Sequence, residues 1–452
     1  MIFIFIILVI SAIGSYIWGY KIPALVVFFF FLTSGFNLIP EKLMTLGFIS
    51  KGSDFAFIIL LVAVIIDSIF IKGYLKRDRF VAFLLLFTAI LLACIVWSKW
   101  RIGLSWSDII RASRYQFFWI AYFLFRNMEK TQLEKLLKWL FNITVFISIL
   151  YLLQIVFNQT ILNEVEIMQA RLFGIKVPRY YNQPDLIQFC TLMAIFYNPH
   201  KGIWRIVTTS LLVMALLGAF HRSMFGFFIV SLLLGVFLKL PYLRKIQYLF
   251  LLLIALFIGT FFAGLRIMDT RTFSDLQKIS QGSYAEVEDF DVEDFFQGAT
   301  FTFRLAILYE RNQYLWENPS TIPLGAGLMP EDSPQTKMLD FKIGLIDKVT
   351  GRAVQVDCGD ISYASMIFRI GYLGTAFYLM LLIYLTVFFY KKRNHRYGLV
   401  SFLFMIFSFG VSLFSSNLLL PATYLLPLIS YCIIQKTEQE EISSNDSEKF
   451  NT

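Results

Sequence analysis

Hydrophobic stretches long enough to cross a lipid bilayer recur along almost the whole chain, and they constrain its fold more than any other feature. A helix needs about 20 consecutive apolar residues to cross a hydrocarbon core of about 30 Å. Hydrophobic residues occupy 58% of the 452 positions and charged residues only 16%, whereas a water-soluble domain would carry about 25% charged residues. So much apolar surface requires lipid as its solvent. The sequence therefore predicts an all-α polytopic protein whose surroundings are a lipid bilayer.

Thirteen segments qualify as candidate membrane spans. They cover residues 2–19, 22–39, 54–71, 80–97, 109–126, 138–157, 186–198, 203–220, 224–238, 246–264, 362–390, 398–416 and 419–434. If the first two stretches are not both complete spans, the number falls to twelve, so we expect 12–13 transmembrane helices. Residues 1–10 lack the basic start of a signal peptide, and we expect them to belong to a retained first span.

Basic residues gather in five short loops between these segments. The clusters are Lys72, Lys76, Arg77 and Arg79; Arg126, Lys130, Lys135 and Lys138; Lys201 and Arg205; Lys239, Arg244 and Lys245; and Lys391, Lys392, Arg393 and Arg396. With these spans all five fall on one side of the membrane, which the positive-inside rule identifies as the cytoplasm. They account for much of the formal charge of +9. We therefore expect no nucleic-acid partner, since no basic groove with interleaved aromatic residues is evident.

This topology divides the chain into four parts. Residues 1–265 and 362–434 form the membrane domain, and residues 435–452 form a cytoplasmic tail with the composition of a disordered segment. Residues 266–361 form one large external loop, in which 266–360 carry nine basic and sixteen acidic residues. The loop is also rich in apolar residues, so we expect a folded cap with a helix near 302–317 and a β-hairpin near 341–357.

The external half of the chain is rich in arginine. Guanidinium groups bind phosphate through a planar fork of donors, and a charge at membrane depth tends to mark a functional path. The pattern indicates an external site for an anionic, phosphorylated, lipid-linked ligand. Each arginine could instead reach lipid headgroups or pair with the acidic loop. The candidates are Arg171, Arg179, Arg222, Arg266, Arg304 and Arg311.

Few other residues suggest chemistry. Asp357 and Asp360 precede the eleventh span, where a carboxylate could accept a proton from a sugar hydroxyl or serve as the counter-ion of an arginine. His221 adjoins Arg222 and could donate a hydrogen bond, although a lone histidine is weak evidence. The sequence has no Cys-x-x-Cys motif, no Cys/His cluster and no Gly-rich phosphate loop. We therefore expect no metal, cofactor or nucleotide.

Four motifs resemble those of the O-antigen ligase and polymerase superfamily of bacterial envelope enzymes. They span residues 165–375, about half the chain, in the family's order around one large external loop. The first three are Arg171-Leu-Phe-Gly174 followed by Asn182-Gln-Pro184; Ala219-Phe-His-Arg222-Ser223; and a helix that opens at Arg304, ends at Asn318-Pro319 and leads to Gly325-Ala-Gly327. The fourth is Asp360-Ile-Ser-Tyr363 followed by Gly371-Tyr-Leu-Gly374.

The resemblance implies a metal-independent glycosyltransferase with a GT-C-like membrane fold. Such an enzyme joins oligosaccharide units carried on undecaprenyl diphosphate at the outer face of the cytoplasmic membrane, in some cases with a chain-length regulator. By this resemblance Arg222 and Arg304 hold the diphosphate, helped by Arg171, Arg179, Arg266 or Arg311. Asp360 is the general base, and Tyr363 is grouped with the substrate-binding residues.

One departure from the family pattern separates two possible activities. Ligases of this family usually have a histidine followed by an asparagine where this chain has Asp360 and Ile361, and this favours a polymerase over a ligase that transfers glycan to lipid A core. A transporter of lipid-linked oligosaccharide is the alternative from another class. It needs charges through the depth of several helices, whereas here Asp67 is a rare deep charge.

Overall fold

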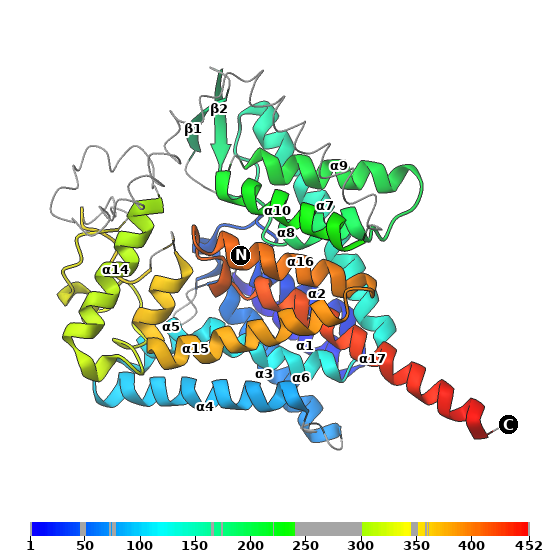
Figure 1. The fold of residues 1–452 in the computed structure, drawn as a ribbon, viewed down its shortest axis with the longest axis horizontal. Helices are drawn as coiled ribbons and strands as arrows, with labels where there is room; N and C mark the ends of the chain where they lie inside the picture. Colours follow the sequence, from blue (N-terminus) through cyan, green and yellow to red (C-terminus); the bar gives the residue numbers. More distant parts are fainter. Residues whose placement is uncertain are drawn as a thin grey trace.

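The computed structural model describes residues 2–45, 51–71, 74, 78–163, 167–172, 175–219, 221–239, 301–344, 351–357, 359 and 361–450, and it is mostly helical (Figure 1). The helices before the large loop are α1 (Ile2–Ile17), α2 (Lys21–Leu32), α3 (Gly52–Phe70), α4 (Arg79–Trp100), α5 (Trp106–Phe117), α6 (Ala121–Arg126), α7 (Lys130–Phe157), α8 (Ile187–Phe196), α9 (Ile203–Gly218) and α10 (Arg222–Lys239). The later helices are α14 (Phe301–Glu317), α15 (Ser362–Lys391), α16 (Arg396–Val411) and α17 (Ala422–Phe450).

Most predicted spans correspond to helices in the part of the chain that the structure describes. Four helices are long and apolar enough to cross a membrane, namely α3, α4, α7 and α15, and six further apolar helices have 10–17 residues. The predicted span at 109–126 is divided between α5 and α6, and the predicted span at 246–264 lies outside the described residues. These helices are compatible with a membrane protein.

The second span ends earlier than hydropathy predicts. α2 stops at Leu32, and the chain then turns through four consecutive residues with positive φ, Ser34 to Asn37. Such left-handed conformations cannot continue a right-handed helix. The 12-residue α2 therefore covers only part of the predicted span 22–39.

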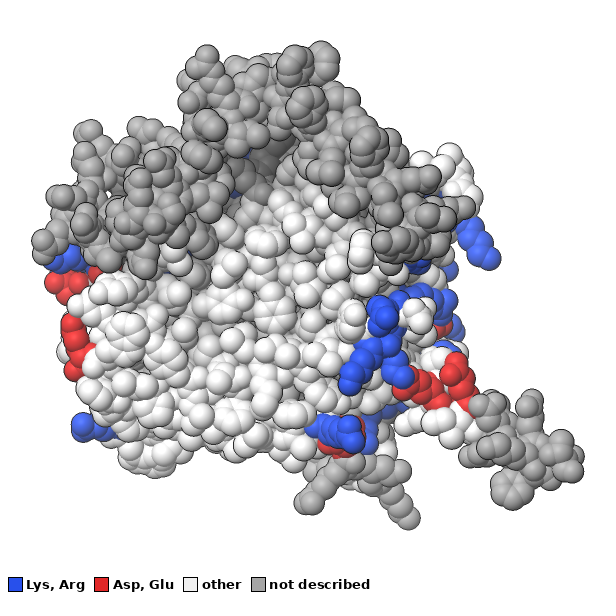
Figure 2. Space-filling model, in the orientation of Figure 1, with Lys and Arg blue, Asp and Glu red and all other residues white. Residues whose placement is uncertain are grey.

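The helices form one bundle in which the first and last thirds of the chain interleave. α4 and α15 lie antiparallel along one side, and the indole of Trp119 stacks on Tyr424 of α17 with ring centroids 4.1 Å apart. The centre of the face in Figure 2 is a broad surface free of Lys, Arg, Asp and Glu. Large apolar side chains such as Phe3, Leu85 and Phe237 are exposed, as expected where lipid is the solvent.

The described residues of the five basic clusters lie at one end of the bundle. Arg126 pairs with Asp78 at 3.3 Å, beside the first cluster, and Arg396 donates to the Tyr197 hydroxyl at 2.6 Å, beside the third. Lys239, of the fourth cluster, donates to the carbonyl oxygen of Phe196. Lys130 and Lys392 pair with Glu440 and Glu438 of α17, and the C-terminus leaves the molecule here (Figures 1 and 2). The structure therefore brings together the clusters that the sequence assigned to one side.

The described part of the large loop lies at the opposite end. α14 confirms the helix predicted near 302–317 and lies beside the ends of α4 and α15 (Figure 1). After α14 the chain packs on the last turn of α4, where Trp97 Nε1 donates to the carbonyl oxygen of Gly325 at 3.0 Å. Leu328 N donates to Ser98 Oγ at 2.9 Å. The described residues 301–344 and 351–357 are thus folded against the end of α4, and we call them the cap.

Two local predictions differ from the structure. The predicted hairpin near 341–357 has a single bridge residue, Ala353, and no β-strand in its described arms, 341–344 and 351–357, and its middle lies outside the described residues. The Gln355 side-chain amide bonds both the N–H and the carbonyl of Phe341, so a side chain replaces the strand ladder. The tail predicted to be disordered continues α17 as helix to Phe450, because extending an existing helix avoids the cost of nucleation.

A backbone junction joins the cap to α15. Gly371 has φ +66° and interrupts α15, and the segment from Ile322 fills the break. Tyr372 N and Leu373 N, freed by the break, donate to the carbonyl oxygens of Ile322 and Pro323. A Cβ atom on Gly371 would lie 2.4 Å from the Pro323 oxygen, and one on Gly325 would lie 2.5 Å from the carbonyl of Arg369. Only glycines permit this approach.

Candidate functional site

Arg179 and His221 lie at the turn between α9 and α10. Arg179 is the last residue but one of β2 (Ile175–Tyr180), which pairs with β1 (Ile167–Leu172) in a two-stranded antiparallel sheet. Its Nε donates to the carbonyl oxygen of Ala219 at 3.1 Å, and its guanidinium lies 4.5 Å from the centre of the Tyr181 ring. His221 follows two residues after Ala219, and its Nδ1 lies 2.8 Å from Ser223 Oγ. The turn therefore fixes both a guanidinium and an imidazole.

Arg304 approaches the same turn from α14. Its guanidinium lies 5.3 Å from the centre of the Phe414 ring, which follows α16. Phe414 in turn contacts Phe227 of α10, with ring centroids 6.1 Å apart. Phe414 thus lies between Arg304 and α10, and Arg304 comes 125 positions further along the chain than Arg179.

The electrostatics show that these groups act on one another. Burial, together with the positive charges of Arg179 and Arg304, lowers the pKa of His221 to about 4. Two cations that disfavour a third charge on the same imidazole form a site of positive potential. A site of positive potential favours an anionic ligand.

Arg311 has a structural role, contrary to the prediction that it helps to bind substrate. Its side chain is 1% exposed and pairs with Glu310. It donates to the carbonyl oxygens of Ile343 at 2.6 Å and Val354 at 2.9 Å. The spacing of seven from Arg304 on one helix does not bring the two guanidinium groups into one site, because Arg304 contacts Phe414 whereas Arg311 packs inside the cap.

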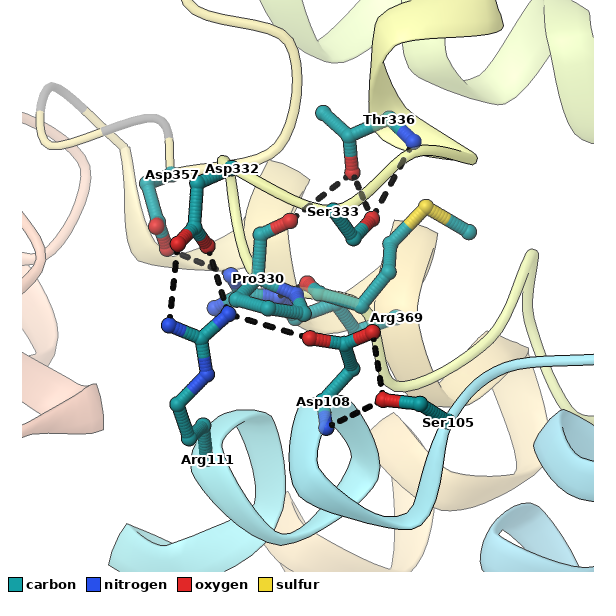
Figure 3. Close-up of polar contacts among 10 residues, drawn as sticks. Ser105, Asp108, Arg111, Pro330, Asp332, Ser333, Thr336, Asp357 and Arg369 are labelled. Carbon is teal, nitrogen blue, oxygen red and sulfur yellow. Dashed lines mark hydrogen bonds and ion pairs between the residues drawn. The ribbon is translucent and has the colours of Figure 1, made fainter. Parts of the chain in front are cut away.

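Asp357 is the counter-ion of an arginine that we did not single out. Its carboxylate pairs with Arg369 of α15, whose Nε donates to the carbonyl oxygen of Met329 (Figure 3). Glu331 accepts hydrogen bonds from the backbone N–H groups of residues 355–357 at 2.7 to 2.9 Å. The segment immediately before Asp360 is therefore held by two charged groups.

A second ion pair fastens the cap to α5. Arg111 donates to both carboxylate oxygens of Asp332, at 2.9 and 2.7 Å, and also to Asp108 at 3.0 Å (Figure 3). The hydrogen bonds from the Arg111 guanidinium lower the pKa of the Asp332 carboxyl group. Sequence reasoning missed Arg111 and Arg369 because only their partners in the folded loop distinguish them from other arginines near helix ends.

The other predicted site residues are placed only in part. Tyr363 lies in the first turn of α15 and donates to the carbonyl oxygen of Phe409 at 3.3 Å. Arg171 lies in β1 opposite Lys176, and Arg222 is the first residue of α10. The side chains of Arg171 and Arg222, and all of Arg266 and Asp360, lie outside the described residues. The predicted approach of Arg222 to Arg304 thus stays a prediction; the positive charge of Arg304 helps to lower the pKa of the adjacent His221.

The arrangement can hold an anion and stabilise negative charge that develops on it. Within the described ranges no three His, Cys, Asp or Glu side chains are grouped so as to hold a metal ion. No protein-family model matches the chain, and no curated protein matches it as a relative.

Proposed function

We propose that this chain is a polysaccharide polymerase of the bacterial cytoplasmic membrane, which joins oligosaccharide repeat units carried on undecaprenyl diphosphate at the periplasmic face. The observation that supports this best is the meeting of Arg179, His221 and Arg304, drawn from three separate elements, at the end of the bundle away from the basic loops. A diphosphate offers guanidinium groups acceptors for charge-assisted, bidentate hydrogen bonds.

The reaction follows from the charges. Arg179 and Arg304, with the neighbouring Arg222, hold the diphosphate and stabilise the negative charge that grows as the bond between sugar and phosphate breaks. Asp360 accepts the proton of the attacking hydroxyl. The sugar–diphosphate bond already stores the energy, so no nucleotide takes part. In this proposal the polytopic GT-C-like fold with 12–13 spans places the large loop in the periplasm.

Arginine substitutions test the site. Arg304→Ala should abolish polymer formation while the protein stays in the membrane at its normal amount, and Arg304→Lys should restore little activity, because lysine offers a point charge in place of a planar fork. Arg393→Ala is the matched control, since Arg393 lies in a basic loop at the opposite end. Full activity of Arg304→Ala would refute the proposed site.

Deletion of the gene separates polymerase from ligase. Loss of a polymerase should leave surface glycan of a single repeat unit on a gel. Loss of a ligase should instead leave long polymer that is not attached to lipid A core. The second pattern would favour the ligase alternative.

The transporter alternative gains no support from the one deep acidic residue. Asp67 is buried and accepts from the Tyr16 hydroxyl at 2.7 Å, with Lys21 Nζ at 3.4 Å. Both partners lie at the turn between α1 and α2. The Tyr16 hydroxyl and the Lys21 ammonium group therefore fix the Asp67 carboxylate in place, and these contacts join α1, α2 and α3.

A further inference from the structure

One side of α14 is exposed and aromatic. Tyr309 and Trp316 are 40% and 54% exposed, and because they lie seven residues apart they share a side of the helix. Gln313 lies between them on the same side and is also exposed. We call these three residues the aromatic side of α14. The other side of the helix is buried in the cap through residues such as Ala306.

The charged residues of α14 lie off the aromatic side. Glu310 and Arg311 bind backbone groups inside the cap, and Arg304 contacts Phe414. Glu317 is the last residue of the helix and accepts a hydrogen bond from the Gln313 amide at 3.0 Å. The large loop carries nine basic and sixteen acidic residues, so an uncharged exposed side on its helix needs a physical reason.

The aromatic side continues onto an exposed apolar side of α15. The Tyr372 hydroxyl donates to Asn312 Oδ1 of α14 at 2.7 Å. From Tyr372 the exposed residues Ala376, Ile383 and Val387 follow along α15, and helical spacing places them on one side. α15 is long and apolar enough to cross a membrane, so this side of it faces lipid in a bilayer. α14 therefore adjoins the lipid-facing surface at Tyr372.

This junction lies where α4 ends. Trp97, in the last turn of α4, donates to the carbonyl oxygen of Gly325, and a Cβ atom on Gly325 would lie 2.6 Å from Gly371 N. Gly371 directly precedes Tyr372, so Tyr372 lies beside the end of α4. In Figure 1 α14 runs crosswise to α4 and α15. A helix that crosses the ends of spanning helices in this way lies along the membrane surface.

The chemistry of the aromatic side fits the headgroup region of a bilayer. Tyrosine and tryptophan concentrate at membrane–water interfaces, because their rings are apolar while the O–H or N–H group remains in contact with water. Single exposed aromatic residues are ordinary on a protein in water. Here two of them share an uncharged side that is continuous with a lipid-facing one, and this continuity favours lipid as the partner.

We propose that α14 is an interfacial helix, whose aromatic side lies in the headgroup region of the leaflet at the cap end of the bundle. The partner of this surface is the bilayer itself. Such contact holds the cap against the leaflet from which a lipid-linked substrate approaches. The inference rests on the membrane location in the proposed function, but not on the anion site or on the reaction.

Spin labels on the full chain test the position of α14, in nanodiscs of phosphatidylethanolamine and phosphatidylglycerol. Cys358→Ser removes one of the four cysteines and the other three are buried, so this chain gives the background. Gln313→Cys then carries a nitroxide on the aromatic side and keeps both rings. Collisions with oxygen, which concentrates in lipid, and with a water-soluble nickel chelate report the depth of the label. We expect it about 5–10 Å deep in the boundary between headgroups and acyl chains.

Two further labels provide matched controls. Ile383→Cys, on the lipid-facing side of α15, should collide with oxygen and exclude nickel. Ile442→Cys should be open to nickel, because it follows the residues of α17 that pair with the basic loops. Ile442 is apolar and 62% exposed, close to the exposure of Trp316. Exposure of an apolar residue alone therefore cannot produce the expected result at position 313.

The outcomes separate this inference from the proposed function. A label at position 313 that nickel reaches as freely as at position 442 overturns the interfacial helix, since the aromatic side then faces water and is open to a glycan. A label shielded from both reagents also overturns it, because a second copy of the chain or another protein then covers this side. In both cases a lipid-exposed label at position 383 leaves the proposed function untouched. Nickel access at position 383 as well would remove the membrane location, and with it both proposals.

Discussion

At the scale of residues, burial and partners separate arginines that look alike in sequence. Arg304 and Arg311 lie on the same helix, but Arg311 is sealed among backbone carbonyls and Glu310, whereas Arg304 is only partly buried against Phe414. Hydropathy does not distinguish the two charges, because each lies near the membrane, where an unpaired charge is costly. Only the folded cap shows that one stabilises the protein and the other faces the candidate site.

This distinction predicts opposite effects for two alanine substitutions. Arg311→Ala should destabilise the protein by about 3–5 kcal/mol, because it leaves the half-buried Glu310 carboxylate and several carbonyls without their cation. It should lower the amount in the membrane and the thermal unfolding temperature in detergent. Arg304→Ala should leave both unchanged and remove activity. Equal stability of the two variants would contradict the structural role of Arg311.

At the scale of elements, the sequence predicts helices well and their connections poorly. Apolar length alone places α3, α4 and α15 close to their observed bounds, and it finds the end of α7 but not its start at Lys130. It cannot find the break in α15, since Gly371 lies in an otherwise apolar run and its partner is the backbone near Pro323. The sheet of β1 and β2 was missed, although its strands are separated by two residues that end in Gly174, a hairpin signal.

The junction between the cap and α15 leads to a prediction about glycines. Gly371→Ala should be strongly destabilising, because its Cβ would meet the Pro323 carbonyl in addition to the strain of a positive φ. Gly351→Ala is the control for strain alone, since Gly351 has φ +64° but no atom near its Cβ position. It should cost about 1 kcal/mol. Thermal unfolding in detergent measures the stability of both variants. A similar loss of stability in the two variants would show that the junction is not tightly packed.

At the scale of the whole molecule, charge sorts the two ends of the bundle. Ion pairs and hydrogen bonds bring the described residues of the five basic clusters and α17 to one end, and the cap with Arg304 lies at the other. The positive-inside rule predicts this arrangement from the sequence, because it needs only the basic residues of the loops and the number of spans between the loops. It could not supply the partners of the tail, Lys130 and Lys392, because those contacts join segments about 50 to 310 positions apart.

The arrangement makes a prediction about topology. Reporters fused after Gly282 and after Ser443 should lie on opposite sides of the membrane, the first outside and the second in the cytoplasm. A phosphatase that is active only in the periplasm should be active at Gly282 and silent at Ser443, and a fluorescent protein that folds only in the cytoplasm should give the reverse pattern. The same signal at both positions would mean that an even number of spans separates them, and not the three spans predicted at 362–390, 398–416 and 419–434. Arg179, His221 and Arg304 would then not face the compartment in which the oligosaccharide units are joined, and the proposed reaction would lose its physical basis.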